Sequence, residues 1–219
     1  LGVKGMDRAS EDYITAREIA LAASCGAHIH ICHVSTYGSV NIIRAAKRDG
    51  VNVTCETAPH YFTYTDEKLL SRDADYRMSP PLRTEKDRQA IEEALLDGTM
   101  DSDPKYAELK ADFEKAPNGV VGLETSLAVT LTELYHTGKC GLDRISELMS
   151  VNPRKILKLR PVKIAVGEPC ELCIFDPEFE WTVEPEKLHS KSKNTVFKGE
   201  KLKGKVFFTV CGGKVVYEL

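Results

Sequence analysis

The first hundred residues alternate between two patterns of apolar and polar positions. Residues 10–26, 38–50 and 84–98 carry apolar side chains at the three- and four-residue spacing of a helix, and each stretch ends at a glycine. Residues 27–34 and 51–58, which follow the first two stretches, are short and rich in β-branched side chains, which predicts strands. Strands that alternate with helices favour a parallel sheet or a barrel.

Individual residues place the ends and the buried faces of these helices. Thr84 and Asp87 stand at the spacing of a capping box at the start of the third helix. Ser10 precedes the first helix and is expected to cap it. The side chains expected to be buried are Ile14, Ile19, Leu21 and Ala22 in the first helix and Val40, Ile43 and Ala46 in the second.

The second half of the chain changes character. Residues 122–138 and 141–159 are helical in pattern, and from about residue 163 short strand-like runs follow one another. Gly212 and Gly213 lie between two runs rich in Val and Phe, which is a strong hairpin signal. We therefore predict an α/β part over residues 1–160 and a small β-rich part over residues 161–219.

Composition narrows the class of protein. The chain has 219 residues, a net charge of −3 and no basic stripe, which argues against a nucleic-acid partner. No apolar run approaches the ~18 residues that span a bilayer, and the first residues contain no apolar signal core. Seven scattered cysteines fit a reducing compartment, so we expect a cytoplasmic protein without a membrane partner.

Three histidines and a cysteine stand close together in the strand predicted over residues 27–34. Side chains alternate along a strand, so His28, His30 and Cys32 are expected on one face and His33 on the other. We interpret the His28 and His30 face as the outer one, covered by helices. His33 ends the strand, where side chains in α/β barrels perform chemistry, and is the candidate metal ligand. One histidine cannot complete a catalytic zinc site, which has about three protein ligands.

The stretch HIHICHVSTYGSVNIIRAAKRDGVNVTCETAPHY closely resembles the dihydroorotase family of the amidohydrolases. The likeness continues in order through PPLRTEKDRQAIEEALLDGT, FEKAPNGVVGLETS and SVNPRKIL to the strands at the end of the chain. The resemblance implies the C-terminal part of a (β/α)₈ barrel followed by a small β-sandwich-like domain. It also implies a zinc cofactor, with two ions in a complete site.

The resemblance implies metal-binding or substrate-binding roles for a few residues. His33 matches the zinc-binding histidine of the H-V-S-T motif, and Asn118 and Gly119 match a loop that touches the substrate ring. Ser79 stands where the family usually has an asparagine that hydrogen-bonds the substrate. His60 follows a predicted strand but is not a usual ligand of the family, and we expect a structural role for it.

Two parts of the family's site are missing from this sequence. The other early ligands would lie upstream of residue 1, and a complete barrel takes about 250 residues. After Asp101 the family continues into a strand that ends T-D-H-A-P-H, whose aspartate binds zinc and acts as the base. No residue here matches that aspartate, so we assign no catalytic residue; Asp101 and Asp103 are the nearest acids and are interpreted as solvated.

The resemblance implies an enzyme that interconverts N-carbamoyl-L-aspartate and dihydroorotate, a step of pyrimidine biosynthesis. The expected partner is that small-molecule substrate, and this chain alone is expected to be inactive. Unpaired sheet edges favour association, so a homo-oligomer is a further expectation. Two alternatives stay open: another cyclic amidohydrolase, of the allantoinase or dihydropyrimidinase kind, or a non-catalytic homologue that binds a partner.

Overall fold

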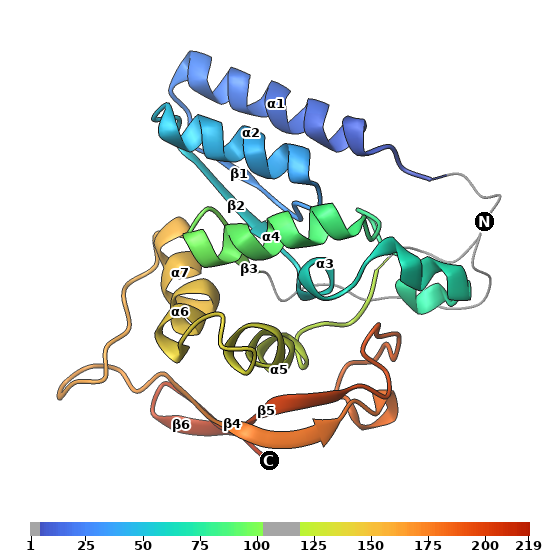
Figure 1. The fold of residues 1–219 in the computed structure, drawn as a ribbon. Coiled ribbons are helices and arrows are strands. Elements are labelled where there is room, and N and C mark those ends of the chain that lie inside the picture. Colours follow the sequence, from blue (N-terminus) through green and yellow to red (C-terminus); the bar gives the residue numbers. More distant parts are fainter. Residues whose placement is uncertain (1–4, 103–118) are drawn as a thin grey trace. The chain divides into compact units, whose positions relative to one another are not determined.

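A computed structural model describes residues 5–102 and 119–219 of the chain (Figure 1). Contacts between residues divide it into two compact units. The first unit covers the described residues up to Glu124 together with Pro185–Val196, and the second covers Thr125–Glu184 and Phe197–Leu219. This division does not coincide with a boundary near residue 160, which stays a prediction. None of the helices in the described ranges has the length and apolar character needed to cross a membrane.

A parallel sheet of three strands forms the centre of the first unit. Its strands are β1 (Ile29–Ile31), β2 (Val53–Thr57) and β3 (Asp101–Ser102), in that order. Ile29 lies opposite Val53 in the register, and Glu56 lies opposite Asp101. Because the strands run parallel, their carboxyl ends meet at one edge, where functional residues of α/β proteins gather. The α/β class predicted from the sequence is thus confirmed for this unit.

Three long helices connect and cover these strands. They are α1 (Arg8–Cys25), α2 (Tyr37–Arg48) and α4 (Glu85–Asp97), and α2 packs against α1, α4 and β2 (Figure 1). Val40, Ile43 and Ala46 of α2 are buried as predicted. The capping box of Thr84 and Asp87 is also present. The shorter elements of the unit are α3 (Pro59–Thr63) and the 3₁₀ helices η1 (Asp66–Ser71), η2 (Ala74–Tyr76) and η5 (Pro185–Lys187).

The first helix differs from its prediction at its start and on its face. Asp7, rather than Ser10, caps α1, and its carboxylate accepts a hydrogen bond from the backbone N–H of Ala9 at 3.0 Å. Ile14 and Leu21 are exposed, and the buried positions of α1 are Thr15, Ile19 and Ala22. Thr15 is buried because its hydroxyl pairs with that of Ser39 at 3.0 Å.

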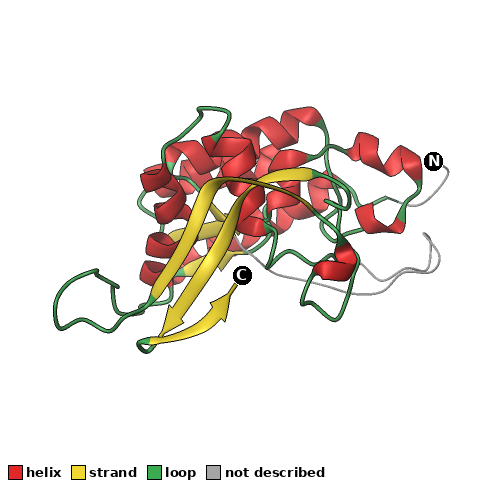
Figure 2. Ribbon diagram, turned by 90° about the horizontal axis from the view of Figure 1, so that it is seen from below, coloured by secondary structure: helices red, strands yellow, loops and turns green. Residues whose placement is uncertain are grey.

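The second unit combines short helical turns with an antiparallel sheet. The helical elements are α5 (Ser126–Thr130), α6 (Leu142–Ser146), α7 (Asn152–Ile156) and the π-helical turns η3 (Leu131–Tyr135) and η4 (Glu147–Val151). The strands β4 (Leu172–Thr182), β5 (Lys201–Cys211) and β6 (Lys214–Glu218) form the sheet (Figure 2). The predicted hairpin is present, because Gly212 and Gly213 have φ values of 57° and 76° between β5 and β6.

Candidate metal centre

The carboxyl ends of β1 and β2 bring His33 and Glu56 together. His33 follows β1 by two residues and has a φ of 57°, a left-handed conformation that is uncommon outside glycine. Its Nδ1 atom lies 3.0 Å from Oε1 of Glu56, near the end of β2. The backbone N–H of His33 donates to the same oxygen at 3.2 Å. The turn after β1 therefore directs His33 toward β2.

The contact with Glu56 places Nδ1 of His33, rather than Nε2, beside a carboxylate. A histidine that ligates a metal usually donates its second ring N–H to a carboxylate or carbonyl, which fixes the tautomer and the ring orientation. Nδ1 lies beside Glu56, so a neutral ring that carries its proton on Nδ1 would present the lone pair of Nε2 to a metal. Glu56 is nearly buried, whereas the His33 side chain is 30% exposed. The carboxylate therefore lies on the buried side of the ring, and part of the ring faces solvent.

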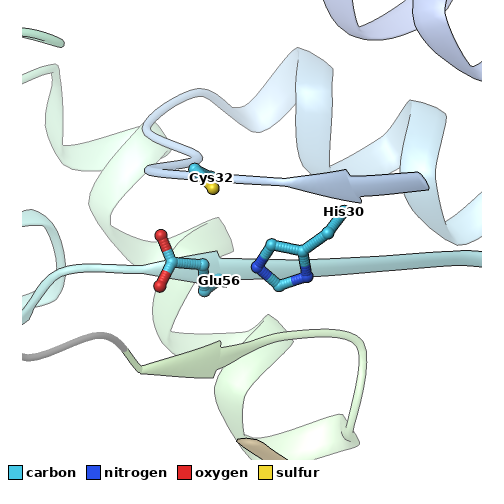
Figure 3. A group of neighbouring side chains, drawn as sticks. All are labelled: His30, Cys32 and Glu56. Atoms are coloured by element: carbon cyan, nitrogen blue, oxygen red, sulfur yellow. The ribbon is translucent and has the colours of Figure 1, made fainter. Parts of the chain in front are cut away.

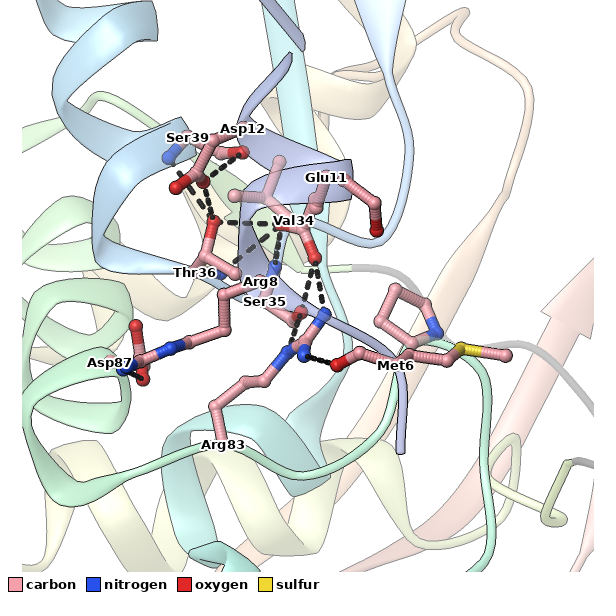
Figure 4. Close-up of polar contacts among 12 residues, drawn as sticks. Met6, Arg8, Glu11, Asp12, Val34, Ser35, Thr36, Ser39, Arg83 and Asp87 are labelled. Atoms are coloured by element: carbon pink, nitrogen blue, oxygen red, sulfur yellow. Dashed lines mark hydrogen bonds and ion pairs between the residues drawn. The ribbon is translucent and has the colours of Figure 1, made fainter. Parts of the chain in front are cut away.

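Glu11 of α1 holds the turn that follows His33 (Figure 4). Its carboxylate accepts from the backbone N–H groups of Ser35 and Thr36 at 2.9 and 3.1 Å, and from both of their hydroxyls. Ser35 and Thr36 are fully buried, so these hydrogen bonds replace water that the groups have lost. On the other side, the hydroxyl of Thr57 donates to the carbonyl of Val34 at 2.8 Å.

Arg83 ties this turn to the segment before α4. Its guanidinium donates to the Ser35 hydroxyl at 3.1 Å, to the Met6 carbonyl at 2.8 Å and to Glu11 Oε2 at 3.3 Å (Figure 4). The Arg83 side chain is only 7% exposed, so its charge relies on these acceptors. The buried ion pair between Arg83 and Glu11 therefore fixes the backbone on which His33 stands.

Asp87 braces the start of α2 in the same network. Its carboxylate accepts from the backbone N–H of Tyr37 at 2.9 Å and pairs with Arg8 at 3.1 Å (Figure 4). Burial disfavours its charged form, but hydrogen bonds from Thr84, Tyr37 and Arg8 together hold the pKa of Asp87 below its ordinary value. Asp87 therefore remains an anion at neutral pH and keeps both contacts.

His60 lies just after β2, at the second position of α3, and is a neutral imidazole. Burial, and then the nearby charge of His33, lower the pKa of His60 from 6.5 to about 3. Its Nε2 atom is buried and has no hydrogen-bond partner within the described ranges. The ring packs edge-on against Tyr61, with 4.2 Å between the centroids. These contacts agree with the packed histidine expected from the sequence, now placed in the electrostatic reach of His33.

The prediction that His28 and His30 lie on the helix-covered face of the sheet is wrong. Cys55 is on that face: it is buried, and its thiol contacts the Thr99 carbonyl that also accepts from Lys47 of α2. His30 pairs with Thr54 in the register, so its side chain lies on the opposite face. His28, just before β1, is exposed. The alternation of side chains along the strand correctly placed His28 and His30 on the same face. It did not indicate which face of the sheet the helices cover.

The positive φ of His33 also changes the expected separation of the histidines. Strict alternation would direct His33 away from His30, but a left-handed residue breaks the pleat and turns the side chain. His33 contacts Glu56, and Glu56 lies within 4.8 Å of the donor atoms of His30 and Cys32 (Figure 3). The sequence therefore did not reveal that these donors surround a single carboxylate.

The predicted substrate residues are only partly described. Ser79 is exposed, and its hydroxyl lies 3.8 Å from the sulfur of Met6. Gly119 has a φ of 124°; its N–H donates to the Arg77 carbonyl at 3.2 Å, and its carbonyl accepts from the Asn194 amide at 2.6 Å. Asn118 and Asp103 lie outside the described residues, as does the side chain of Asp101. The roles proposed for Ser79, Asn118 and Gly119 stay predictions.

Sequence reasoning missed three residues of this centre: Glu56, Glu11 and Arg83. Glu56 had a usable signal, since it is an acid near the end of a predicted strand parallel to the one before His33. Glu11 and Arg83 had none, because their partners are 24 and 48 residues away in sequence. The centre offers an imidazole held by a carboxylate, and this donor chemistry fits a divalent metal such as zinc.

The whole chain aligns with proteins named dihydroorotase. Proteins named dihydroorotase from Geobacter sp. (strain M21) and Citrifermentans bemidjiense are each 47% identical to it over 224 residues. The match covers 100% of this chain but 52% and 53% of those proteins, so the chain spans about half the length of the curated relatives it matches. No protein-family model matches. By sequence, the chain is a relative of the dihydroorotases over that half.

Solved structures of related enzymes share the fold. The dihydropyrimidinase from Brevibacillus agri NCHU1002 is 29% identical, with a TM-score of 0.88 over 95% of this chain and 48% of that one. A D-hydantoinase is 30% identical, with a TM-score of 0.89 over 97% of this chain and 50% of that one. The chain therefore has the α/β fold found in about half of each of these proteins.

Proposed function

We propose that this chain is the C-terminal half of a zinc-dependent dihydroorotase, which interconverts N-carbamoyl-L-aspartate and dihydroorotate in the cytoplasm. One observation carries the proposal: His33 stands at a strand end with Nδ1 held 3.0 Å from Glu56, in a chain that aligns along its full length with dihydroorotases. Residues 1–160 would form the later βα units of a (β/α)₈ barrel. Residues 161–219 would form the small β-sandwich-like domain.

His33 is proposed as the one metal ligand that this chain retains. Its Nε2 would bind zinc, while Glu56 keeps the ring in place and Glu11 and Arg83 keep the following turn in place. When bound, a pair of zinc ions would lower the pKa of a shared water and polarise the ring carbonyl of the substrate. The remaining ligands would come from the half of the barrel that this sequence does not contain.

Three residues are proposed to meet the substrate. Asn118 and Gly119 would present their loop to the ring, and the contact of the Gly119 carbonyl with Asn194 anchors the end of that loop. Ser79 would replace the family's asparagine with a hydroxyl, which keeps one donor and one acceptor but has a shorter reach. The general base of the family, an aspartate, has no match here, so the chain by itself should lack turnover.

Two other functions remain, each with an observation in its favour. The structural similarity to a dihydropyrimidinase and a D-hydantoinase favours another cyclic amidohydrolase. The missing T-D-H-A-P-H segment favours a non-catalytic homologue that binds a partner, including a second copy of this chain. The 47% identity to dihydroorotases, against 30% or less to the two solved enzymes, favours dihydroorotase over both alternatives.

A completed chimera separates these functions. In it, this chain replaces the aligned half of the Geobacter sp. (strain M21) relative, and a strand ending T-D-H-A-P-H is inserted after Asp101. We expect kcat/KM for dihydroorotate to exceed that for allantoin, dihydrouracil and hydantoin by about 100-fold or more, because a site built to hydrogen-bond one substrate rejects others strongly. A preference for another substrate would favour the first alternative. Bound zinc without turnover of any substrate would favour the second.

A further inference from the structure

We propose that His30, Cys32 and Glu56 form a second metal-binding site, separate from the one assigned to His33, which takes a borderline divalent cation such as Zn²⁺. The three side chains come from β1, the turn after it and β2, and they share the face of the sheet opposite α2 (Figure 3). Their ligand atoms all lie within 4.8 Å of one another. This site goes beyond the proposed function, which assigns no role to His30 or Cys32.

The spacing is close to that of a filled site. In a tetrahedral zinc site with bonds of about 2.0–2.3 Å, neighbouring ligand atoms lie about 3.3–3.8 Å apart. The donors of His30, Cys32 and Glu56 therefore need to approach one another by no more than about 1.5 Å. Three protein ligands and one open position are a common arrangement for zinc.

The ring of His30 is already oriented for binding. Its Nδ1 atom lies 2.8 Å from the hydroxyl of Thr54, the residue opposite it in the register. That hydroxyl also lies 2.9 Å from Nε2 of His28, so it can accept from one ring and donate to the other. With Nδ1 at Thr54, the other ring nitrogen of His30 points toward Glu56 (Figure 3). A ligating histidine held by an oxygen through its second nitrogen is the usual pattern in zinc sites.

Glu56 can serve both sites because a carboxylate has two oxygens. Oε1 is 3.0 Å from His33 Nδ1, and a carboxylate oxygen of Glu56 lies within 4.8 Å of the ligand atoms of His30 and Cys32. The charge of the three donors also balances. A cation binds the thiolate form of Cys32, so the thiol proton is released to solvent, and thiolate plus carboxylate neutralise the two positive charges. Thiolate and imidazole ligands select zinc-like cations over Mg²⁺ and Ca²⁺.

Cobalt(II) titration of the 219-residue chain tests the site directly. A cobalt ion bound by Cys32 gives a thiolate-to-metal charge-transfer band, which oxygen and nitrogen ligands do not give. We expect the band in the wild-type chain, its loss in Cys32→Ser, and at least about ten-fold weaker Zn²⁺ affinity in both Cys32→Ser and His30→Ala. Cys25→Ser, at another exposed cysteine, and His33→Ala should both retain the band. Its loss in His33→Ala would overturn the claim of a separate site.

A second measurement needs no variant. Alkylation of the wild-type chain with iodoacetamide, read by mass spectrometry, reports each cysteine separately. We expect Zn²⁺ to protect Cys32 and leave Cys25 unchanged, and Mg²⁺ to protect neither. Equal labelling of Cys32 with and without Zn²⁺, or a cobalt band that survives in Cys32→Ser, would overturn the proposal. Because neither readout involves substrate, both outcomes are independent of whether the chain belongs to a dihydroorotase.

Discussion

Replacing His33 with alanine in the completed chimera is expected to reduce dihydroorotate turnover by at least about 100-fold and to lower the zinc content. The loss of an outer partner of a metal ligand alone costs roughly 10–100-fold in affinity or activity, so the loss of the ligand itself should cost more. The residue is chosen because its Nδ1 lies 3.0 Å from Glu56, and its Nε2 is the nitrogen proposed to bind the metal. Metal analysis and steady-state kinetics on the same preparation measure both effects.

His28→Ala is the matched control for that experiment. His28 precedes β1, at the opposite end of the strand, and its side chain is exposed. We expect the His28→Ala chimera to keep its turnover within about two-fold, because exposed substitutions away from the catalytic centre rarely change more. Equal zinc and equal turnover in the His33→Ala and unsubstituted chimeras would remove His33 from the metal site.

Arg83→Met should be the most destabilising change in the network behind His33. Breaking a buried ion pair from one side costs about 3–5 kcal/mol, because the remaining charge loses its partner. Glu11 keeps the donors on Ser35 and Thr36, so we expect the lower end, about 3 kcal/mol, in the free energy of unfolding by urea. The 219-residue chain is suitable for this measurement, since Arg83 and its acceptors all lie within one compact unit.

Arg17→Met provides the comparison for Arg83. Arg17 forms an ion pair with Glu18 on α1, but its side chain is 49% exposed and both groups remain in water. Exposed pairs contribute at most about 1 kcal/mol, so this change should cost about 0.5 kcal/mol or less. Similar costs for the two variants would show that the contacts of Arg83 with Ser35, Met6 and Glu11 do not stabilise the turn.

Local signals in the sequence predicted much of the first unit. The apolar positions Val40, Ile43 and Ala46 recur at helical spacing and are buried, because packing and periodicity favour the same face of α2. Thr84 and Asp87 form the capping box, whose partners are three residues apart. The Gly212–Gly213 hairpin was equally local, since only its two residues need a positive φ.

Features that depend on distant residues were predicted poorly. The first helix begins at Arg8 because Asp7 caps it, although Ser10 has the right chemistry for a cap. Which face of β1 carries helices depends on where α2 crosses the sheet, and a strand's alternation holds no information about that. The role of Glu56 depended on the left-handed conformation of His33. A histidine at that position does not predict this conformation from the sequence.

Hydrolysis of dihydroorotate by the purified 219-residue chain, supplied with zinc, tests whether this sequence holds only one ligand of a dihydroorotase metal site and lacks the base and the other ligands. Catalytic zinc needs about three protein ligands, and a general base alone contributes roughly 10²–10⁴-fold. We expect a rate equal to that of a zinc-only blank, with no change on adding a chelator. Turnover above the blank that the chelator abolishes would contradict it, and would indicate that residues such as Asp101 or Asp103 complete the site.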